Sequence, residues 1–544
     1  MPTESSTPYV ALDTAEIPSR RAYPPLVALI CAVGALAATL RAVVVVAEQF
    51  ADLHPPQVLP YVEPTVVRSA GGVLDYTLRV DSGVWRLPHN ISFRTRLYNG
   101  LAPSPVLWAS PGDRVRLTVV NALGDDAPTT ASIGYREANT TNLHLHGIRD
   151  SVEHDDTFAR VRPGEQKVYD FRLDATSGTT LMLYHPHADG STSLQSFGGM
   201  GGALVVEDAA QEDALSLPVV ASRVALLQVL NFDPTAPDYV VAMLQNGGTS
   251  AMNCAVHNPS GFLGVLLVVN GGDALDEVVP LGGWLRLKLV NAVTATHMGG
   301  SVELGFSPTA PCTVAALALD GVWLAAPRKQ RTVVVPPGGR AELAVGCAAG
   351  GTHVFGTVES AYGGAVEGGH SVALLRVPHC ATCGGRPAAM TPLPHTLPGP
   401  PKYYSDLRGV GVRHSEAITF STPDGGNVVN RRPYDRRRVD FHLQLGAVAE
   451  WRLRSAEAPA TPLKLHPFHQ HVTHFQVVNV TTATGEADGD ALARVGDWRD
   501  TIPLYGNVAY VVRFVSPFAG LMMVHCHIQK HSEYGMMALA EVGG

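Results

Sequence analysis

The sequence predicts an all-β protein built from three consecutive Greek-key β-sandwich domains. One ten-residue strand pattern occurs three times, at residues 112–121, 282–291 and 446–455. No long stretch keeps a helical period, and turn signals such as Pro163-Gly164 recur between apolar runs. The 54 Gly and 40 Pro also favour short strands joined by turns. Three copies of one strand imply three similar domains, and sandwiches are the simplest fold for such domains.

Each copy alternates apolar and polar side chains, as a strand with one buried face does. In the second copy, Leu285, Leu287 and Leu289 are expected to face the core, whereas Arg286 and Lys288 are expected to face solvent. The first copy follows the same alternation, and the third follows it more faintly.

The copies and the segments between them predict the domain organisation. We expect an N-terminal tail at residues 1–21, a hydrophobic segment at 22–47, and sandwich domains at 63–212, 218–378 and 413–544. The Pro- and Gly-rich segment 379–412 is expected to be a long linker between the second and third domains.

The N-terminal hydrophobic segment predicts where the rest of the chain resides. Residues 22–47 are apolar apart from Arg41, and they follow Arg20 and Arg21. The run 26–40 fits the core of a signal peptide, whereas the full segment is long enough to span a bilayer. We expect a signal-anchor, with a cleaved signal peptide as the alternative. Both place the remaining chain on the extracellular or lumenal side, because flanking positive charges stay in the cytosol.

Other features agree with a secretory route. We expect one or two disulfides, with Cys312–Cys347 as our hypothesis, because such bonds persist in oxidising compartments. Cys380-x-x-Cys383 lacks a second pair, so we interpret it as a linker feature rather than a zinc or redox motif. The net charge of −8 gives no electrostatic case for nucleic-acid binding. Three glycosylation sequons begin at Asn90, Asn139 and Asn479.

Four short stretches contain paired histidines. They are NLHLHG at 142–147, YHPH at 184–187, HPFHQH at 466–471 and HCH at 525–527. On a strand, His-x-His places both imidazoles on one face about 7 Å apart, which suits two neighbouring metal ions better than one. Two pairs come from the first third of the chain and two from the last third. We therefore expect a cluster of eight imidazoles between the first and third domains, with the second domain as a spacer.

Strand parity predicts a second, mononuclear site behind the same strands. His466 lies three residues before His469 and should face away from it, just as Cys526 faces away from the histidines on either side. A thiolate, two imidazoles and an axial thioether form an electron-transfer copper site, and Cys526, His466, His531 and Met536 supply these groups. Structural zinc prefers Cys-rich sites, so we expect copper. His154 and His474 lie off this pattern and are expected to support the ligands or the fold.

These motifs resemble those of the multicopper oxidases, the family of laccases, bilirubin oxidases and metal oxidases. The resemblance runs from about residue 63 to residue 542, and TRLYNG at 95–100 is its first recognisable motif. It implies cupredoxin-like domains and four copper ions. The implied type 1 ligands are His466, Cys526, His531 and Met536, the type 2 ligands are His144 and His469, and the type 3 ligands are His146, His185, His187, His471, His525 and His527.

The resemblance also implies the reaction. One-electron oxidation of a small-molecule reductant at the type 1 copper would be coupled to four-electron reduction of O2 to water at the trinuclear cluster. The Cys526 thiolate would pass electrons through the backbone to His525 and His527. Because the reaction consumes protons, we expect a carboxylate relay near the cluster, and Asp155 and Asp156 are the candidates.

Three residues depart from common family patterns. Asp189 stands where many members have a further His that is not usually a ligand, so copper binding should survive. Ser532 stands where bacterial members often carry a relay Glu, and whether Glu533 replaces that group stays open. A thioether from Met536 implies a lower-potential type 1 copper, which disfavours very hard-to-oxidise substrates.

The leading functional hypothesis is a laccase-like oxidase of phenols or aromatic amines. The alternative is a metal oxidase acting on Fe(II), Mn(II) or Cu(I), which would need carboxylates near the type 1 site, with Asp497 and Asp500 as candidates. The absence of a Met-rich insertion and the total of 11 Met disfavour Cu(I). A non-catalytic cupredoxin-fold surface protein is a third hypothesis, and the retention of all twelve ligands disfavours it. The membrane is an expected partner through residues 22–47 if these are not cleaved.

Overall fold

The computed structural model describes most of the chain beyond residue 62. The described residues are 63–126, 129, 131, 133–232, 260–261, 264–292, 300–359, 366, 368–380, 387–423, 426–457, 465–482 and 493–544. They belong to the unit Leu59–Gly544. The predicted tail 1–21 and hydrophobic segment 22–47 therefore lie outside the described residues. Within the described part, no helix is both long enough and apolar enough to cross a membrane.

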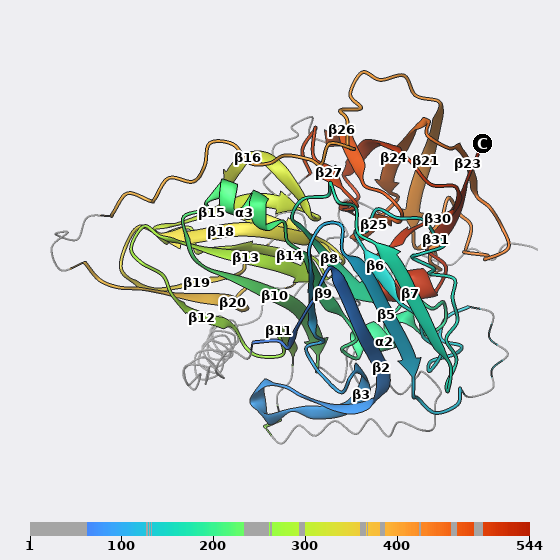
Figure 1. The fold of residues 1–544 in the computed structure, drawn as a ribbon, viewed down its shortest axis with the longest axis horizontal. Coiled ribbons are helices and arrows are strands. Elements are labelled where there is room, and N and C mark those ends of the chain that lie inside the picture. Colours follow the sequence, from blue (N-terminus) through green and yellow to red (C-terminus); the bar gives the residue numbers. More distant parts are fainter. Residues whose placement is uncertain are drawn as a thin grey trace, which may run out of the picture. The chain divides into compact units, whose positions relative to one another are not determined.

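The first domain is a sandwich of two sheets, drawn in blue to green in Figure 1. One sheet has the order β3-β2-β5-β7 and the other β1-β4-β9-β8-β6. The elements are β1 Val66–Arg68, β2 Val73–Arg86, the short 3-10 helix η1 Pro88–Asn90, β3 Ser92–Tyr98, β4 Val106–Ala109, β5 Arg114–Asn121, β6 His144–His146, β7 Gln166–Arg172, β8 Thr180–His185, α2 Thr192–Phe197, β9 Gly202–Val206 and α3 Ala209–Leu215.

The second domain repeats this plan, in green to yellow (Figure 1). Its sheets have the orders β11-β10-β13-β18-β15-β16 and β12-β20-β19-β14-β17. The strands are β10 Val219–Asn231, β11 Val265–Val269, β12 Leu275–Val278, β13 Trp284–Asn291, β14 Val302–Gly305, β15 Cys312–Leu319, β16 Val322–Gln330, β17 Thr332–Val335, β18 Arg340–Cys347, β19 Gly351–Thr357 and β20 Ser371–Val377.

The third domain, in orange to red, is again two sheets (Figure 1). Their orders are β22-β21-β24-β29-β26-β27 and β23-β31-β30-β25-β28. The elements are β21 His414–Ser421, β22 Val428–Val429, β23 Phe441–Gln444, β24 Val448–Ser455, β25 His466–Gln470, β26 Phe475–Thr482, β27 Trp498–Arg499, β28 Thr501–Leu504, β29 Val508–Val515, β30 Gly520–Cys526, α5 Gln529–Glu533 and β31 Met537–Gly543. The all-β prediction with three consecutive sandwiches is confirmed. The proposed boundaries of the domains stay predictions.

The repeated strand pattern occupies one topological position in all three domains. β5, β13 and β24 each pair in parallel with the first long strand of their domain and antiparallel with a later one. Their inward side chains are buried, as predicted: Leu117, Leu287 and Trp451 have no exposed surface. Each domain therefore grows around the same central strand.

The prediction that Arg286 and Lys288 face solvent is wrong. Both are nearly fully buried, at 3% and 1% exposure. Arg286 donates to Glu342 of β18 and to Glu212 of α3, and Lys288 lies 3.6 Å from the same Glu342. Alternation correctly placed these cations opposite the leucines, but carboxylates cover that face too. A buried charge is tolerated when it is paired and hydrogen-bonded.

The disulfide hypothesis is confirmed, because Cys312 and Cys347 are bonded across directly paired positions of β15 and β18. Cys380 is also disulfide-bonded. Asn139 is a poor glycosylation site, since it is 1% exposed and its side-chain oxygen accepts two hydrogen bonds from Arg96. The described linker residues 387–412 contain neither helix nor strand.

Candidate metal centre

Strand pairing brings the four histidine motifs together. In the first domain β6 pairs antiparallel with β8, so that His144 lies opposite His185. In the third domain β25 pairs antiparallel with β30, so that His469 lies opposite His525. The edge strand β6 then faces the third domain, where β25 and β30 lie beside it (Figure 1). These two strand registers bring the histidines that share a strand face close together in space.

The eight imidazoles form one buried cluster between the first and third domains. The rings of His144 and His471 stack at 4.1 Å between centroids, and those of His146 and His469 stack at 3.7 Å. Each stack joins one residue of the first domain to one of the third. The predicted location of the cluster therefore agrees with the structure.

Within the cluster, the imidazoles divide into groups that suit separate ions. In one group the Nε2 atom of His525 lies 3.2 Å from that of His187 and 3.1 Å from that of His471. A second group contains His146, His185 and His527, whose ligand atoms all lie within 4.8 Å of one another. In each group three imidazole nitrogens lie close together, an arrangement that suits the ligation of one metal ion.

The remaining pair presents free nitrogens. The Nδ1 atom of His144 is 2.7 Å from Asp155 Oδ2, and that of His469 is 3.0 Å from the Asp500 carbonyl oxygen. Because these acceptors hold the proton on Nδ1, Nε2 carries the lone pair. The Nε2 atoms of His144, His469 and also His185 are buried and have no hydrogen-bond partner among the described residues. Buried polar atoms without partners are rare, so these fit copper ligation.

Burial keeps the cluster imidazoles neutral and able to bind metal. It lowers the pKa of His185 and His525 to about 4. For His144, burial and the neighbouring imidazoles hold the pKa well below its ordinary value. Protonation would bring like charges within a few ångströms of each other and away from water, and each effect disfavours it.

The mononuclear group lies behind β25 and β30. Cys526 Sγ is 3.7 Å from the Nδ1 atoms of both His466 and His531, which lie 3.2 Å from each other. Met536 is fully buried in the same core, and its backbone is bonded to Cys526 and His531. His531 is the partly exposed member of this group. Burial raises the pKa of the Cys526 thiol, so a bound cation would be needed to hold it as thiolate.

The two relay candidates occupy different environments. Asp155 is buried, accepts a hydrogen bond from the Leu145 amide and touches His144. Burial raises the pKa of Asp155 to about 8. Asp156 instead pairs with Lys167 at the surface, at 30% side-chain exposure. The structure thus brings only Asp155 to the cluster.

The structure also locates the residues that depart from the family patterns. Asp189 pairs with Arg136. Ser532 donates to the Gln529 carbonyl inside α5. Glu533 is buried, accepts a hydrogen bond from the Thr192 amide, and lines a cavity of about 190 Å³ that His187 also lines. Burial and the charge of Asp189 raise the pKa of Glu533 to about 8.

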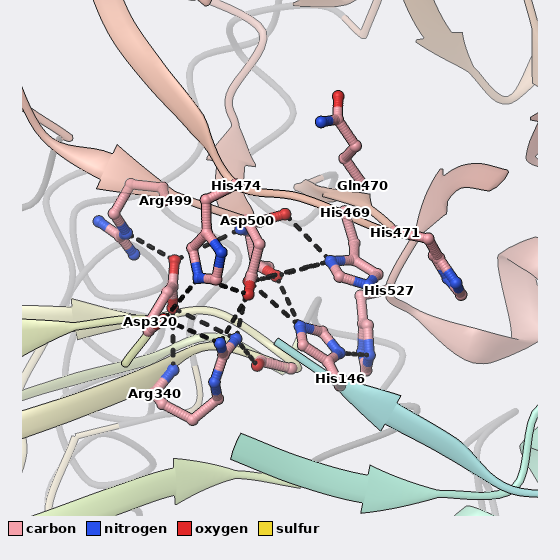
Figure 2. Close-up of polar contacts among 12 residues, drawn as sticks. His146, Asp320, Arg340, His469, Gln470, His471, His474, Arg499, Asp500 and His527 are labelled. Carbon is pink, nitrogen blue, oxygen red and sulfur yellow. Dashed lines mark hydrogen bonds and ion pairs between the residues drawn. The ribbon is translucent and has the colours of Figure 1, made fainter. Parts of the chain in front are cut away.

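The second domain, which was expected to act as a spacer, also contacts the surroundings of the cluster. Figure 2 shows Asp500 between Arg340 of the second domain and two cluster histidines. Asp500 Oδ1 lies 3.2 Å from His146 Nε2, and Arg340 donates to both Asp500 carboxylate oxygens, at 2.7 and 2.6 Å. Burial alone would raise the pKa of Asp500, but the Arg340 guanidinium outweighs it and holds that pKa below its usual range.

The carboxylates that were proposed near the type 1 site lie elsewhere. Asp500 belongs to the cluster, and Asp497 pairs with Arg328. The carboxylate beside the mononuclear group is Glu457, whose Oε1 atom is 3.4 Å from His466 Nε2. Sequence reasoning missed this contact because Glu457 is part of no motif.

The two off-pattern histidines occupy different environments, and only His474 lies next to a residue that touches the cluster. His474 is buried and bonds to the Tyr404 hydroxyl, to the Asp320 carbonyl and to Asp500. His154 is half-exposed and bonds only to Asp150 among the described residues.

Comparison with known proteins agrees with this geometry. Two family models, both described as multicopper oxidase, match residues 80–211 and 409–543. A multicopper oxidase of Staphylococcus epidermidis is 23% identical over 480 residues, covering 87% of this chain and 89% of that protein. The structure of a multicopper oxidase from Campylobacter jejuni, described as a metallo-oxidase, aligns with a TM-score of 0.66 at 18% identity, covering 90% of this chain and 98% of that one.

A laccase-like multicopper oxidase from an Ochrobactrum species aligns with a TM-score of 0.66 at 21% identity, covering 89% of this chain and 100% of that one. The two family models match the two domains that carry the histidine motifs, and in the structure those motifs meet as one buried cluster with a Cys-His-His group behind it. The chain therefore belongs to the multicopper oxidase family, the copper-dependent oxidoreductases that use O2 as electron acceptor.

Proposed function

We propose that the chain oxidises phenols or aromatic amines one electron at a time at a type 1 copper and reduces O2 to water at a trinuclear cluster. The observation that carries this proposal is the position of Cys526. It belongs to the mononuclear group, while its neighbours His525 and His527 belong to two different groups of the cluster. One strand thus links a site for single electrons to a site that can collect four.

Four copper ions fit the donor groups. Type 1 copper would be held by His466, Cys526, His531 and Met536, and type 2 copper by His144 and His469. The type 3 pair would be held by His146, His185 and His527 on one ion, and by His187, His471 and His525 on the other. When bound, copper supplies the one-electron steps that no side chain provides.

The exposure and contacts of the surrounding residues indicate where the donor would bind and which carboxylate would relay protons. Because His531 is the partly exposed member of the mononuclear group, a donor would approach there. All eight imidazoles of the cluster are buried, and the cavity that His187 and Glu533 line reaches one of them. Asp155 is the proposed proton-relay carboxylate, because it touches His144 whereas Asp156 does not.

Oxygen consumption tests the proposal. The purified chain, loaded with copper, would be given a phenol, Fe(II) and Mn(II) in separate reactions while O2 uptake and donor oxidation are followed. We expect four donor molecules oxidised per O2 consumed, with no peroxide released. Full copper loading without O2 uptake from any donor would refute the oxidase function.

A metal oxidase is the second candidate, and Glu457 favours it. Its Oε1 atom contacts a type 1 ligand and also accepts hydrogen bonds from the Thr422 amide and hydroxyl, so a cationic donor would be held close to the copper through the other carboxylate oxygen. The Glu457→Gln variant separates the candidates. If the chain is a metal oxidase, the variant should lose Fe(II) or Mn(II) oxidation and keep phenol oxidation. If the chain is an oxidase of aromatic donors, the variant should keep the wild-type rates with the phenol and with both metal ions.

We further propose an extracellular or lumenal location, with residues 22–47 as the anchor. The Cys312–Cys347 disulfide supports this location, because disulfides persist in oxidising compartments. Fractionation after an alkaline wash tests it: an uncleaved anchor keeps the chain in the membrane pellet, and release into the supernatant contradicts anchoring.

A further inference from the structure

Arg340, at the start of β18, joins all three domains through a single side chain. Its Nε atom donates to the Leu181 carbonyl of the first domain, at 3.2 Å. Its Nη1 and Nη2 atoms donate to the carbonyls of Gly338 and Asp320 in the second domain, at 3.1 and 2.9 Å. Its two bonds to Asp500 of the third domain complete the set. A guanidinium has five N–H donors, so every donor of this buried side chain is used.

Asp500, which Arg340 holds in place, contacts two histidines of the cluster. Besides the contact between its carboxylate and His146 Nε2, its backbone carbonyl accepts from His469 Nδ1 at 3.0 Å. Thr501 reinforces both contacts, since its hydroxyl lies 3.0 Å from His146 Nε2 and 3.2 Å from His469 Nδ1. Asp500, between β27 and β28, and Thr501, the first residue of β28, therefore contact imidazoles that belong to two different groups of the cluster.

The contact fixes which nitrogen of His146 can bind metal. A neutral imidazole carries one proton, and acceptors at Nε2 hold it there. The lone pair then lies on Nδ1, which is 3.1 Å from His527 Nε2 within the same group. If Asp500 shifted or rotated, His146 could turn or change tautomer and lose the geometry of that group.

We propose that Arg340 is a positioning residue for the trinuclear copper site. It clamps the Asp500 carboxylate so that His146 presents Nδ1, and His469 presents Nε2, toward the metal. The inference rests on the proposed function, because it concerns the cluster that would bind copper and reduce O2. It gives the second domain, which supplies no ligand, a direct role in building the site.

Lysine cannot replace Arg340 in this role. An ammonium group has three donors around one nitrogen, so it cannot grip both carboxylate oxygens and three carbonyls at once. Arg340→Lys keeps the positive charge and removes the paired hydrogen bonds to the two Asp500 carboxylate oxygens. A matched control exists in the same domain: Arg286 is also buried, with bidentate carboxylate contacts to Glu212 and Glu342 rather than to the Asp500 segment. Arg286→Lys removes a similar pair of hydrogen bonds from a guanidinium to a carboxylate, at a position away from the cluster.

The test compares copper retention and spectra of the full-length wild type, Arg340→Lys and Arg286→Lys. Each protein is loaded with copper and challenged with a chelator. Copper per chain, the blue absorption of the Cys526 site and the near-ultraviolet absorption of the coupled copper pair are measured. We expect Arg340→Lys to keep the blue band and to lose cluster copper at a chelator concentration about 10–100-fold lower than the wild type does. Arg286→Lys should match the wild type in all three readouts.

Thermal denaturation of the copper-free proteins separates positioning from stability. If both lysine variants are destabilised alike and both keep all their copper, the proposal is overturned. If Arg340→Lys does not fold, Asp500→Ala decides, because it removes the side-chain acceptor at His146 Nε2 that Arg340 holds. Retention of the coupled-pair absorption in Asp500→Ala would likewise overturn the proposal. If the wild type binds no copper, the result counts against the proposed function itself. If the wild type binds copper and the variants bind it equally well, the result counts only against this inference.

Discussion

The sharpest prediction concerns Gly338, which lies in the turn between β17 and β18 and packs against two cluster histidines. A Cβ atom at Gly338 would lie 2.6 Å from His146 Cε1 and 2.7 Å from His527 Cδ2, closer than such atoms can approach. The residue also has a φ of +79°, which favours glycine. Gly338→Ala should therefore both destabilise the fold and displace two proposed ligands of one copper ion.

An internal repeat supplies the control. Gly164 occupies the equivalent turn of the first domain: its amide donates to the Asn121 carbonyl at 2.9 Å, as the Gly338 amide donates to the Asn291 carbonyl at 2.8 Å. Its φ is +83°, yet a Cβ atom there would meet nothing within 4 Å. Gly164→Ala thus carries the backbone strain without the clash.

The two costs can be separated. Left-handed backbone at a residue with a Cβ atom costs about 1–2 kcal/mol, which both variants share. Overpacking a filled site adds about 1–3 kcal/mol, which only Gly338→Ala incurs. In denaturant unfolding of the copper-free chain, Gly164→Ala should lose about 1–2 kcal/mol, and Gly338→Ala about 2–5 kcal/mol in all. Equal losses, together with unchanged copper binding by Gly338→Ala, would refute the packing of this turn against the cluster.

Three further predictions follow from the site. Lowered imidazole pKa values mean that the unfolded chain binds more protons below about pH 6.5, so acid should destabilise the copper-free protein. His185, with a pKa of about 4, contributes about 2 kcal/mol to this loss between about pH 7 and about pH 5. The raised pKa values of Asp155 and Glu533 act in the opposite direction, but the eight buried imidazoles outnumber them, and melting curves across this range should show the net loss. Cys526→Ser should abolish the blue absorption while cluster copper stays bound, and absorbance with copper analysis will show whether it does. Asp155→Asn should slow O2 uptake about 10–100-fold, whereas Asp156→Asn should leave it within about twofold; similar rates for the two variants would remove Asp155 as the relay.

The placement of the histidines could be predicted from the sequence because it depends on local geometry. A strand alternates its faces, so the spacing of His466, His469 and Cys526 assigns each to a side before any fold is known. The structure adds only the registers that bring the strands together. Arg286 shows the limit of this reasoning, since alternation gives the face on which a side chain lies but not whether another segment covers that face.

The contribution of the second domain could not be predicted for a related reason. Arg340 and Asp500 are 160 positions apart, and neither belongs to a recognisable motif. Their hydrogen bonds form only where the second and third domains pack together. None of the twelve proposed ligands comes from the second domain, so no motif in its sequence marks it as part of a metal site. Gly338 is a turn glycine like Gly164 in sequence, and only its neighbours make it different.

The second domain contributes to the cluster through the segment that its Arg340 side chain holds. The first and third domains supply all eight imidazoles of the cluster, and acceptors at the second ring nitrogen orient several of these rings. For His146 and His469, those acceptors belong to the segment that Arg340 holds. Because Arg340 also bonds to the carbonyl of Leu181 in the first domain, it ties the two ligand-bearing domains to one rigid point. Through Arg340 the second domain therefore contacts both ligand-bearing domains next to the cluster, which is why a change in a domain without ligands is expected to alter copper binding.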